Sequence, residues 1–124
     1  METHFPTDCG HAPRIGIVGH FITNWAKGNI DAVAEQLTDD ATWTVAGEET
    51  YSGTSEMDRV FPRTAPELLS VTSIITHGRL ASCDGFLKNG SARMHFSHVF
   101  RFASTSKAAK IKDARSYYIE TLTR

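Results

Sequence analysis

The stretch that decides the fold is RMHFSHVFRF, residues 93–102. Every second residue in it is large and apolar, except for His98. This alternating set is Met94, Phe96, His98, Phe100 and Phe102. Successive residues of a β-strand point to opposite faces of the sheet, so we expect the set to face the interior. An unpaired polar group in an apolar interior costs roughly 2–7 kcal/mol on transfer scales. The pattern therefore predicts either a structural hydrogen-bond partner for His98 or a functional cavity in front of it.

Three further segments are expected to form strands, and with the first they predict an antiparallel meander. They are LLSVTSIITH (68–77), RLASCDGFLK (79–88) and AKIKDARSYYIETL (109–122). Gly78 marks the first reversal, and Asn89-Gly90 is typical of a two-residue type I′ hairpin loop. With that loop, Cys83 shares a face with His98 at one diagonal step, because cross-strand neighbours point to the same side. A three-residue loop would place Cys83 on the other face.

The first half of the chain has the spacing of helices. Pro13 is favoured in a first helical turn, Gly28 is a common C-terminal stop, and apolar residues recur between them. These residues are Ile15, Val18, Phe21, Ile22 and Trp25. Asn29 can cap a second short helix, and a third helix is expected to begin at Ser55. A short strand, DATWTVAG (40–47), is expected between the second and third helices.

Helices followed by a meander predict an α+β fold whose helices cover one face of the sheet, and 124 residues fit a single domain. We assign residues 13–124 to that domain and residues 1–12 to a flexible tail. His4, Cys9 and His11 lie in this tail and could together bind a metal, but a mobile tail without metal is the favoured interpretation.

Composition and charge exclude several classes of partner. The net charge is −1 with no run of Lys and Arg, so neither nucleic acid nor an anionic membrane is expected to bind. No apolar stretch approaches the roughly 20 residues of a membrane span. The first residues carry acids, histidines and prolines in place of the apolar core of a signal peptide, and Cys9 and Cys83 form no disulfide framework. We therefore expect a cytoplasmic protein.

Four segments of the chain carry a family resemblance through their order and spacing. They are NWAKGNIDAVAEQLTDDATWTVAG (24–47), YSGTSEM (51–57), HFSHVFRF (95–102) and KIKDARSYYIE (110–120). Together they resemble the nuclear transport factor 2-like (NTF2-like) superfamily, and within it the SnoaL-like polyketide cyclases and ketosteroid isomerases. The resemblance covers residues 14–122. It implies a cystatin-like cone in which a curved antiparallel sheet wraps around N-terminal helices and encloses a pocket, and a dimer formed through the outer sheet face.

The catalytic groups of well-known enzymes of this fold are absent from the matching positions. The resemblance places Val45 at the aspartate base of ketosteroid isomerase, Phe21 at its oxyanion-hole tyrosine and His98 at its protonated aspartate. Limonene-epoxide hydrolase needs an Arg-x-Asp pair and a further Asp, which the inward positions of the last two strands lack. These positions are Phe96, His98, Phe100, Ala114, Ser116 and Tyr118. Scytalone dehydratase uses histidines, tyrosines and a serine, which His98, Ser116 and Tyr118 resemble in residue type alone.

The sequence offers two candidate catalytic residues and a larger set of expected pocket-lining residues. His98, as a neutral imidazole, and Tyr118, as a hydrogen-bonding phenol, are the candidate catalytic groups. The expected pocket lining is Phe21, Trp25, Trp43, Val45, Phe61, Cys83, Met94, Phe96, Phe100 and Ser116. For each of these residues a purely structural role in the core is the alternative. Cys83 beside His98 is expected to act as a small hydrophobe and not as a nucleophile.

Three functions remain open. The leading one is a pocket for a hydrophobic, oxygenated small molecule, in its catalytic form a cofactor-independent isomerase, cyclase or dehydratase. The second is a ligand-binding protein without catalysis. The third is a dimeric assembly module, which a core without a cavity would favour. A homodimer is expected, since the outer face combines apolar groups and charges at Val99, Arg101, Tyr117 and Ile119. No metal or cofactor is expected to take part.

Overall fold

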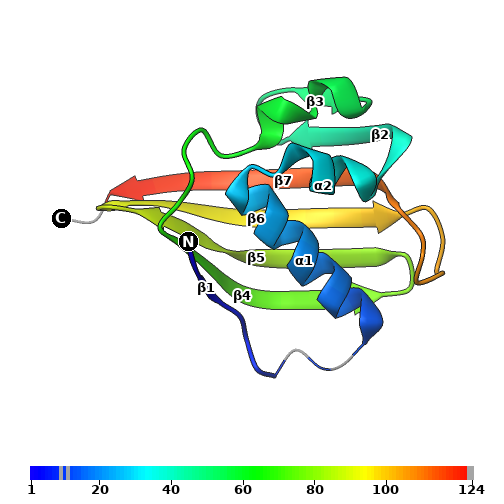
Figure 1. Cartoon of the computed structure of the whole chain (residues 1–124), viewed down its shortest axis with the longest axis horizontal. Helices are drawn as coiled ribbons and strands as arrows, with labels where there is room; N and C mark the ends of the chain where they lie inside the picture. Colours follow the sequence, from blue (N-terminus) through cyan, green and yellow to red (C-terminus); the bar gives the residue numbers. More distant parts are fainter. Residues whose placement is uncertain (9, 11, 123–124) are drawn as a thin grey trace.

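The computed structural model describes residues 1–8, 10 and 12–122, without the side chains of residues 54, 55 and 122. Two α-helices, α1 (Pro13–Lys27) and α2 (Ile30–Glu35), lie on one face of a curved sheet that does not close into a barrel (Figure 1). A 3₁₀-helix, η1 (Thr54–Val60), lies beside one end of the sheet. The predicted α+β class is confirmed.

Seven strands build the sheet. They are β1 (Glu2–His4), β2 (Leu37–Val45), β3 (Thr50–Ser52), β4 (Leu68–His77), β5 (Leu80–Asn89), β6 (Ala92–Phe102) and β7 (Ile111–Leu122). Their order across the sheet is β1-β4-β5-β6-β7-β2-β3. The predicted antiparallel meander from β4 to β7 is confirmed. β1 pairs with β4 and β2 pairs with β7 in parallel, so the sheet is mixed and not purely antiparallel as expected.

The α1 helix begins and ends where its sequence predicts. Pro13 lies in the first turn, and Gly28 follows the last residue with φ 74°, a left-handed conformation that costs glycine little. The buried face of the helix includes Val18, Phe21, Ile22 and Trp25. Figure 1 shows the helix crossing the meander obliquely. Asn29 caps α2, since its side-chain oxygen accepts a hydrogen bond from the backbone N–H of Ala32 at 3.4 Å. The two helices therefore present one apolar layer to the sheet.

The hairpin between β5 and β6 differs from the predicted register. Asn89 pairs with Ala92, so the loop is Gly90-Ser91 and the prediction of an Asn89-Gly90 loop was wrong. Gly90 has φ 62° and no residue other than glycine has a positive φ in the described chain, which matches a type II′ turn with glycine in first place. The shift is by two residues, so every side chain keeps its face. Cys83 consequently lies directly opposite His98.

A bulge and a glycine bend the sheet in the middle of β4 and β5. The pairing of these strands skips Thr72, which is left as an extra residue on β4 near Gly85. A Cβ built on Gly85 would lie 2.0 Å from the backbone oxygen of Ser70. Only glycine therefore permits this close approach of the two strands. Bulges and glycine kinks are the devices that give a sheet its curvature.

Three local features differ from the sequence-based expectations. Glu2–His4, within the expected tail, form β1 at one edge of the sheet. The sequence did not predict this strand, because three residues are too few to show an alternating pattern. β3 at the opposite edge is equally short. The expected third α-helix is the 3₁₀-helix η1, which starts one residue before Ser55. Phe61 leaves it with extended backbone, the conformation favoured before a proline.

Two negative findings apply to the described residues. Among them, no group of three His, Cys, Asp or Glu side chains is placed to hold a metal ion. Cys9 and His11, two of the three candidate ligands of the N-terminal segment, lie outside the described residues. No described helix is long and apolar enough to cross a membrane.

Replacing Gly85 by Ala is expected to lower the free energy of unfolding by about 3 kcal/mol or more, since the added methyl group meets backbone and not a movable side chain. Urea denaturation measures the change. Gly16→Ala is the control, because Gly16 is an exposed α1 residue with no atom within 4 Å of an added Cβ. This control should be more stable than wild type by about 0.5–1 kcal/mol. A Gly85→Ala variant with wild-type stability would contradict the proposed cause of the bend.

Candidate functional site

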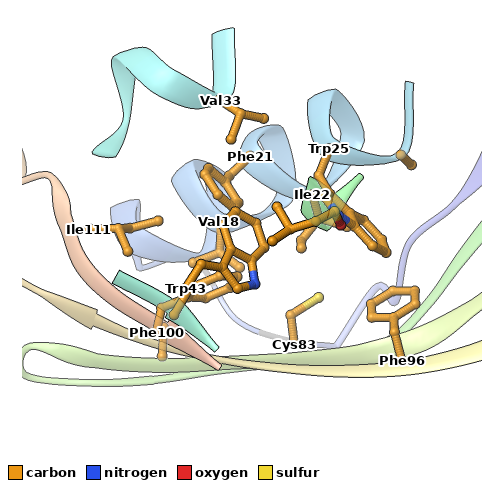
Figure 2. Close-up of a cluster of buried hydrophobic side chains, with 14 of the residues drawn as sticks. Val18, Phe21, Ile22, Trp25, Val33, Trp43, Cys83, Phe96, Phe100 and Ile111 are labelled. Atoms are coloured by element: carbon orange, nitrogen blue, oxygen red, sulfur yellow. The ribbon is translucent and has the colours of Figure 1, made fainter. Parts of the chain in front are cut away.

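Aromatic rings fill the space between α1 and the sheet, where the sequence predicted a pocket (Figure 2). Phe21 stacks on Trp43 with 5.7 Å between ring centroids and meets the edge of Phe100 at 5.2 Å. Trp25 meets Phe96 edge-on at 5.3 Å. All five side chains are buried. The predicted lining residues thus come together as expected, but as a packed core, and the cavity is not confirmed.

Ser116 of β7 joins two polar side chains inside this core. The indole Nε1 of Trp43 donates a hydrogen bond to Ser116 Oγ at 2.7 Å, and Nδ1 of His98 lies 2.6 Å from the same oxygen. The strand pairing brings these three side chains together. Ser116 lies opposite His98 on β6, and on its other side it pairs with Val45 of β2, two residues after Trp43 on the same strand. All four residues are buried. His98 therefore has the structural partner that one of the two initial interpretations required.

The second ring nitrogen of His98, Nε2, is buried and has no hydrogen-bond partner in the described structure. The rings of Trp25, Phe96 and Phe100 lie around the imidazole at centroid distances of 4.5, 5.0 and 5.8 Å. Burial among these rings lowers the pKa of His98 from 6.5 to about 3, because the charged form would lose its hydration. The imidazole is therefore neutral at physiological pH.

Two other titratable groups of the core, Cys83 and Tyr118, also have pKa values far from neutral pH. Burial raises the pKa of the Cys83 thiol to about 12, and the charge of Asp84 adds to the rise. Burial likewise raises the pKa of Tyr118 to about 12. A general acid or base works best with a pKa near the working pH, and a cysteine nucleophile must be deprotonated. Neither His98, Cys83 nor Tyr118 meets these conditions in this arrangement.

The backbone carbonyl of Val60 fastens two aromatic side chains at the margin of the core. It accepts hydrogen bonds from Trp25 Nε1 at 2.8 Å and from the Tyr118 hydroxyl at 3.4 Å. The two rings stack with their centroids 6.1 Å apart. Phe61 and Met94, two further members of the predicted lining, are only partly buried against the core. The sequence could not reveal the role of Val60, because its contribution is a main-chain carbonyl that no side-chain pattern encodes.

Two hollows lie on other parts of the described structure. One of about 560 Å³ lies between β4 and the N-terminal segment, and its lining includes Asp8, Ile15 and Ile75. The other lies on the outer face of the sheet over the bend, and its lining includes Phe86, His95, Tyr117 and Ile119. Neither hollow is lined by His98, so neither serves as the pocket that was expected.

Solved structures resemble this chain, whereas no family model and no curated protein matches it. An NTF2-like protein of unknown function from Burkholderia xenovorans LB400 superposes with a TM-score of 0.71 at 17% identity, over 90% of this chain and 86% of that one. An NTF2-like protein of unknown function from Cytophaga hutchinsonii ATCC 33406 has a TM-score of 0.65 at 17% identity, over 85% and 98%. An LEH-like epoxide hydrolase from M. tuberculosis has a TM-score of 0.63 at 20% identity, over 86% and 83%.

The chain has the NTF2-like fold. The fold implied by the sequence resemblance is thus confirmed, while identities this low carry no activity from one protein to the other. The predicted inward positions of β6 and β7 face the core, and none of them carries a carboxylate. They are Phe96, His98, Phe100, Ala114, Ser116 and the partly buried Tyr118. The chain has this fold, but its interior lacks the acids that the resemblance led us to look for.

Replacing Ser116 by Ala is expected to lower the free energy of unfolding by about 2–4 kcal/mol, because Trp43 Nε1 and His98 Nδ1 both lose their partner and each buried orphan costs about 1–3 kcal/mol. Chemical denaturation monitored by tryptophan fluorescence measures the loss. Ser97→Ala, on the opposite face of the adjacent strand, is the matched control and should change stability by less than about 0.5 kcal/mol. Equal stabilities of the two variants would show that Ser116 holds nothing together.

The lowered pKa of His98 should make the protein less stable in acid. Above about pH 6.5 the group is neutral in both states, whereas between about pH 6.5 and about pH 3 only the unfolded chain binds its proton. Stability from this group is therefore full above pH 6.5 and falls by up to about 1.4 kcal/mol per pH unit as the pH decreases. In His98→Leu, the decline between about pH 4 and about pH 6 should be shallower by that amount. Urea melts of both proteins test this, and identical slopes would refute a neutral buried imidazole.

Proposed function

We propose that this protein is a non-catalytic assembly module of the NTF2-like fold that works as a homodimer joined through the outer face of its sheet. The observation that supports the proposal is the aromatic packing of the interior, in which rings of α1, β2 and β6 contact one another where the sequence predicted a pocket. The sequence favoured a ligand pocket and left the assembly module as an alternative that a core without a cavity would favour.

The chemistry of the interior supports the same choice. His98 is a very weak base at a pKa of about 3, and it already contacts Ser116. Tyr118 is a weak acid whose hydroxyl is engaged by the Val60 carbonyl. No second acid–base group was evident near His98 in the sequence, and Cys83 opposite it is a protonated thiol. General acid–base catalysis needs groups that exchange protons near neutral pH, which this core does not offer.

The outer face of the sheet has the composition of a protein interface. Tyr117 and Ile119 project from β7 with 48% and 67% of their surface exposed. Phe86 on β5 and His95 on β6 continue this patch, since His95 pairs with Phe86 on one side and with Ile119 on the other. Exposed aromatic and aliphatic groups in one patch mark surfaces that gain free energy by leaving water. The proposed partner is a second copy of the chain, and a net charge of −1 permits this, since two copies repel each other little.

Ile119→Asp is expected to dissociate the dimer. Wild type should have twice the chain mass of 13.7 kDa in light scattering at micromolar concentration. An unpaired carboxylate buried in the interface should raise the dissociation constant by about 100-fold or more, so that the variant has the mass of one chain. Ile30→Asp is the control, because Ile30 is also exposed but belongs to α2 on the other side of the sheet. A wild-type protein of one chain mass, or a dimeric Ile119→Asp variant, would overturn the proposed interface.

A hydrophobic, oxygenated small molecule bound inside the fold is a second candidate function. The unpartnered Nε2 of His98 favours it, because a ligand oxygen would pair with this buried nitrogen. Such a ligand needs Trp25 to move away from the imidazole and to release the Val60 carbonyl. A native mass spectrum showing a small molecule retained on the purified chain would select this function, with His98 and Tyr118 as its polar contacts.

A further inference from the structure

Arg14 is a buried cation that lies outside the site described above. It is the second residue of α1, and only 9% of its surface is exposed. Its guanidinium lies over the ring of Phe102, with the central carbon 3.9 Å from the ring centroid. Stacking on an aromatic face stabilises a cation, but it does not replace the hydrogen bonds that the N–H groups lose on leaving water.

The hydrogen bonds of Arg14 are few and weak for a buried charge. Nη2 donates to the backbone oxygens of Ser104 and Ser106 at 3.4 and 3.2 Å, which is longer than usual for a charged donor. Nη1 is buried and has no partner in the described structure. No carboxylate of the described residues forms an ion pair with this guanidinium. A guanidinium stays protonated in proteins, so a positive charge lies here without a counter-anion from the part of the chain that the structure describes.

The neighbourhood of Arg14 is otherwise suited to an anion. The 15-residue helix α1 begins here with no acidic residue in its first turn and no side-chain hydrogen bond at its N-cap, so neither feature offsets the positive end of the helix. The loop that Arg14 touches carries an unbroken run of hydroxyl and amine side chains. The run is Ser104, Thr105, Ser106 and Lys107, and all four residues are exposed.

We propose that Arg14 and the loop of residues 104–107 form a binding site for a tetrahedral oxyanion of the phosphate type. The anion would exchange the two long carbonyl contacts of Nη2 for charge-assisted bonds and would give Nη1 its missing acceptor. The exposed loop would turn its hydroxyl groups and Lys107 toward the same anion. This site lies at the β6–β7 loop, and it depends neither on the interior of the fold nor on the proposed dimer face.

Inorganic phosphate is the probe, titrated into the ¹⁵N-labelled full-length chain at neutral pH and followed by the backbone amide resonances. Sodium chloride at matched ionic strength gives the reference. We expect saturable shifts of the amides of residues 104–108 and of the first turn of α1, with a dissociation constant in the millimolar range. Arg14→Gln should weaken this binding by about tenfold or more, because it removes the charged donors.

Arg101→Gln is the matched control, since it removes the same charge from an exposed position next to Phe102 and should leave phosphate binding unchanged. If Arg14→Gln does not fold, as far-ultraviolet circular dichroism would show, Arg14→Lys takes its place. Lysine keeps the charge but loses the planar fork, so binding should weaken by several-fold. Wild-type shifts that chloride reproduces would overturn the proposal, and so would equal phosphate affinities of the Arg14 and Arg101 variants.

Discussion

The backbone oxygen of Ser70 on β4 occupies the place where any residue other than glycine at position 85 would carry its Cβ. This close approach, together with the extra residue Thr72, bends β4 and β5 in the middle of the meander. The bend gives the sheet an inner face across which α1 can lie, as Figure 1 shows, and an outer face that no helix covers. The core lies on the face that α1 covers, and the outer patch lies on the opposite face.

Large aromatic side chains, and not charged groups, cover the inner face of the sheet. Two tryptophans and three phenylalanines from α1, β2 and β6 take up the volume in front of the sheet, and Ser116 provides the one hydroxyl to which Trp43 and His98 both turn. A buried polar group is tolerated when it has a partner, and this pair of contacts explains how an imidazole stands among aromatic rings. The same burial that fits His98 into the core takes its pKa far from the range that catalysis uses.

The outer patch and the Arg14 site favour different kinds of partner. The outer patch around Tyr117 and Ile119 is apolar and exposed, so it gains free energy by contact with another apolar surface. Arg14 is charged and buried, so it gains by contact with an anion. Since one lies on β7 and the other at the start of α1, a dimer and an anion would occupy different parts of the molecule. Binding at either place leaves the interior as it is.

The sequence by itself determined the elements that have a periodic or a local code. Alternation in β6, the helical repeat and Gly28 stop of α1, and the Asn29 cap of α2 were all predictable, because each depends on neighbouring residues alone. The same alternation predicted that His98 faces inward. The parallel pairing of β1 and β2, the hairpin register and the 3₁₀ form of η1 were not predictable. They depend on contacts between distant segments or on elements too short to show a period.

The tertiary structure alone decided what His98 faces. The sequence allowed a cavity or a partner, and the choice required the volumes of side chains from α1, β2 and β6 to be placed in one space. It also decided the role of Val60, whose own main-chain oxygen accepts a hydrogen bond from Trp25, 35 residues away in the chain. The same holds for Arg14, which donates to the main-chain oxygen of Ser106, 92 residues away. Packing and main-chain contacts of this kind depend on how distant segments of the chain meet in three dimensions. A pattern of residue types does not contain them.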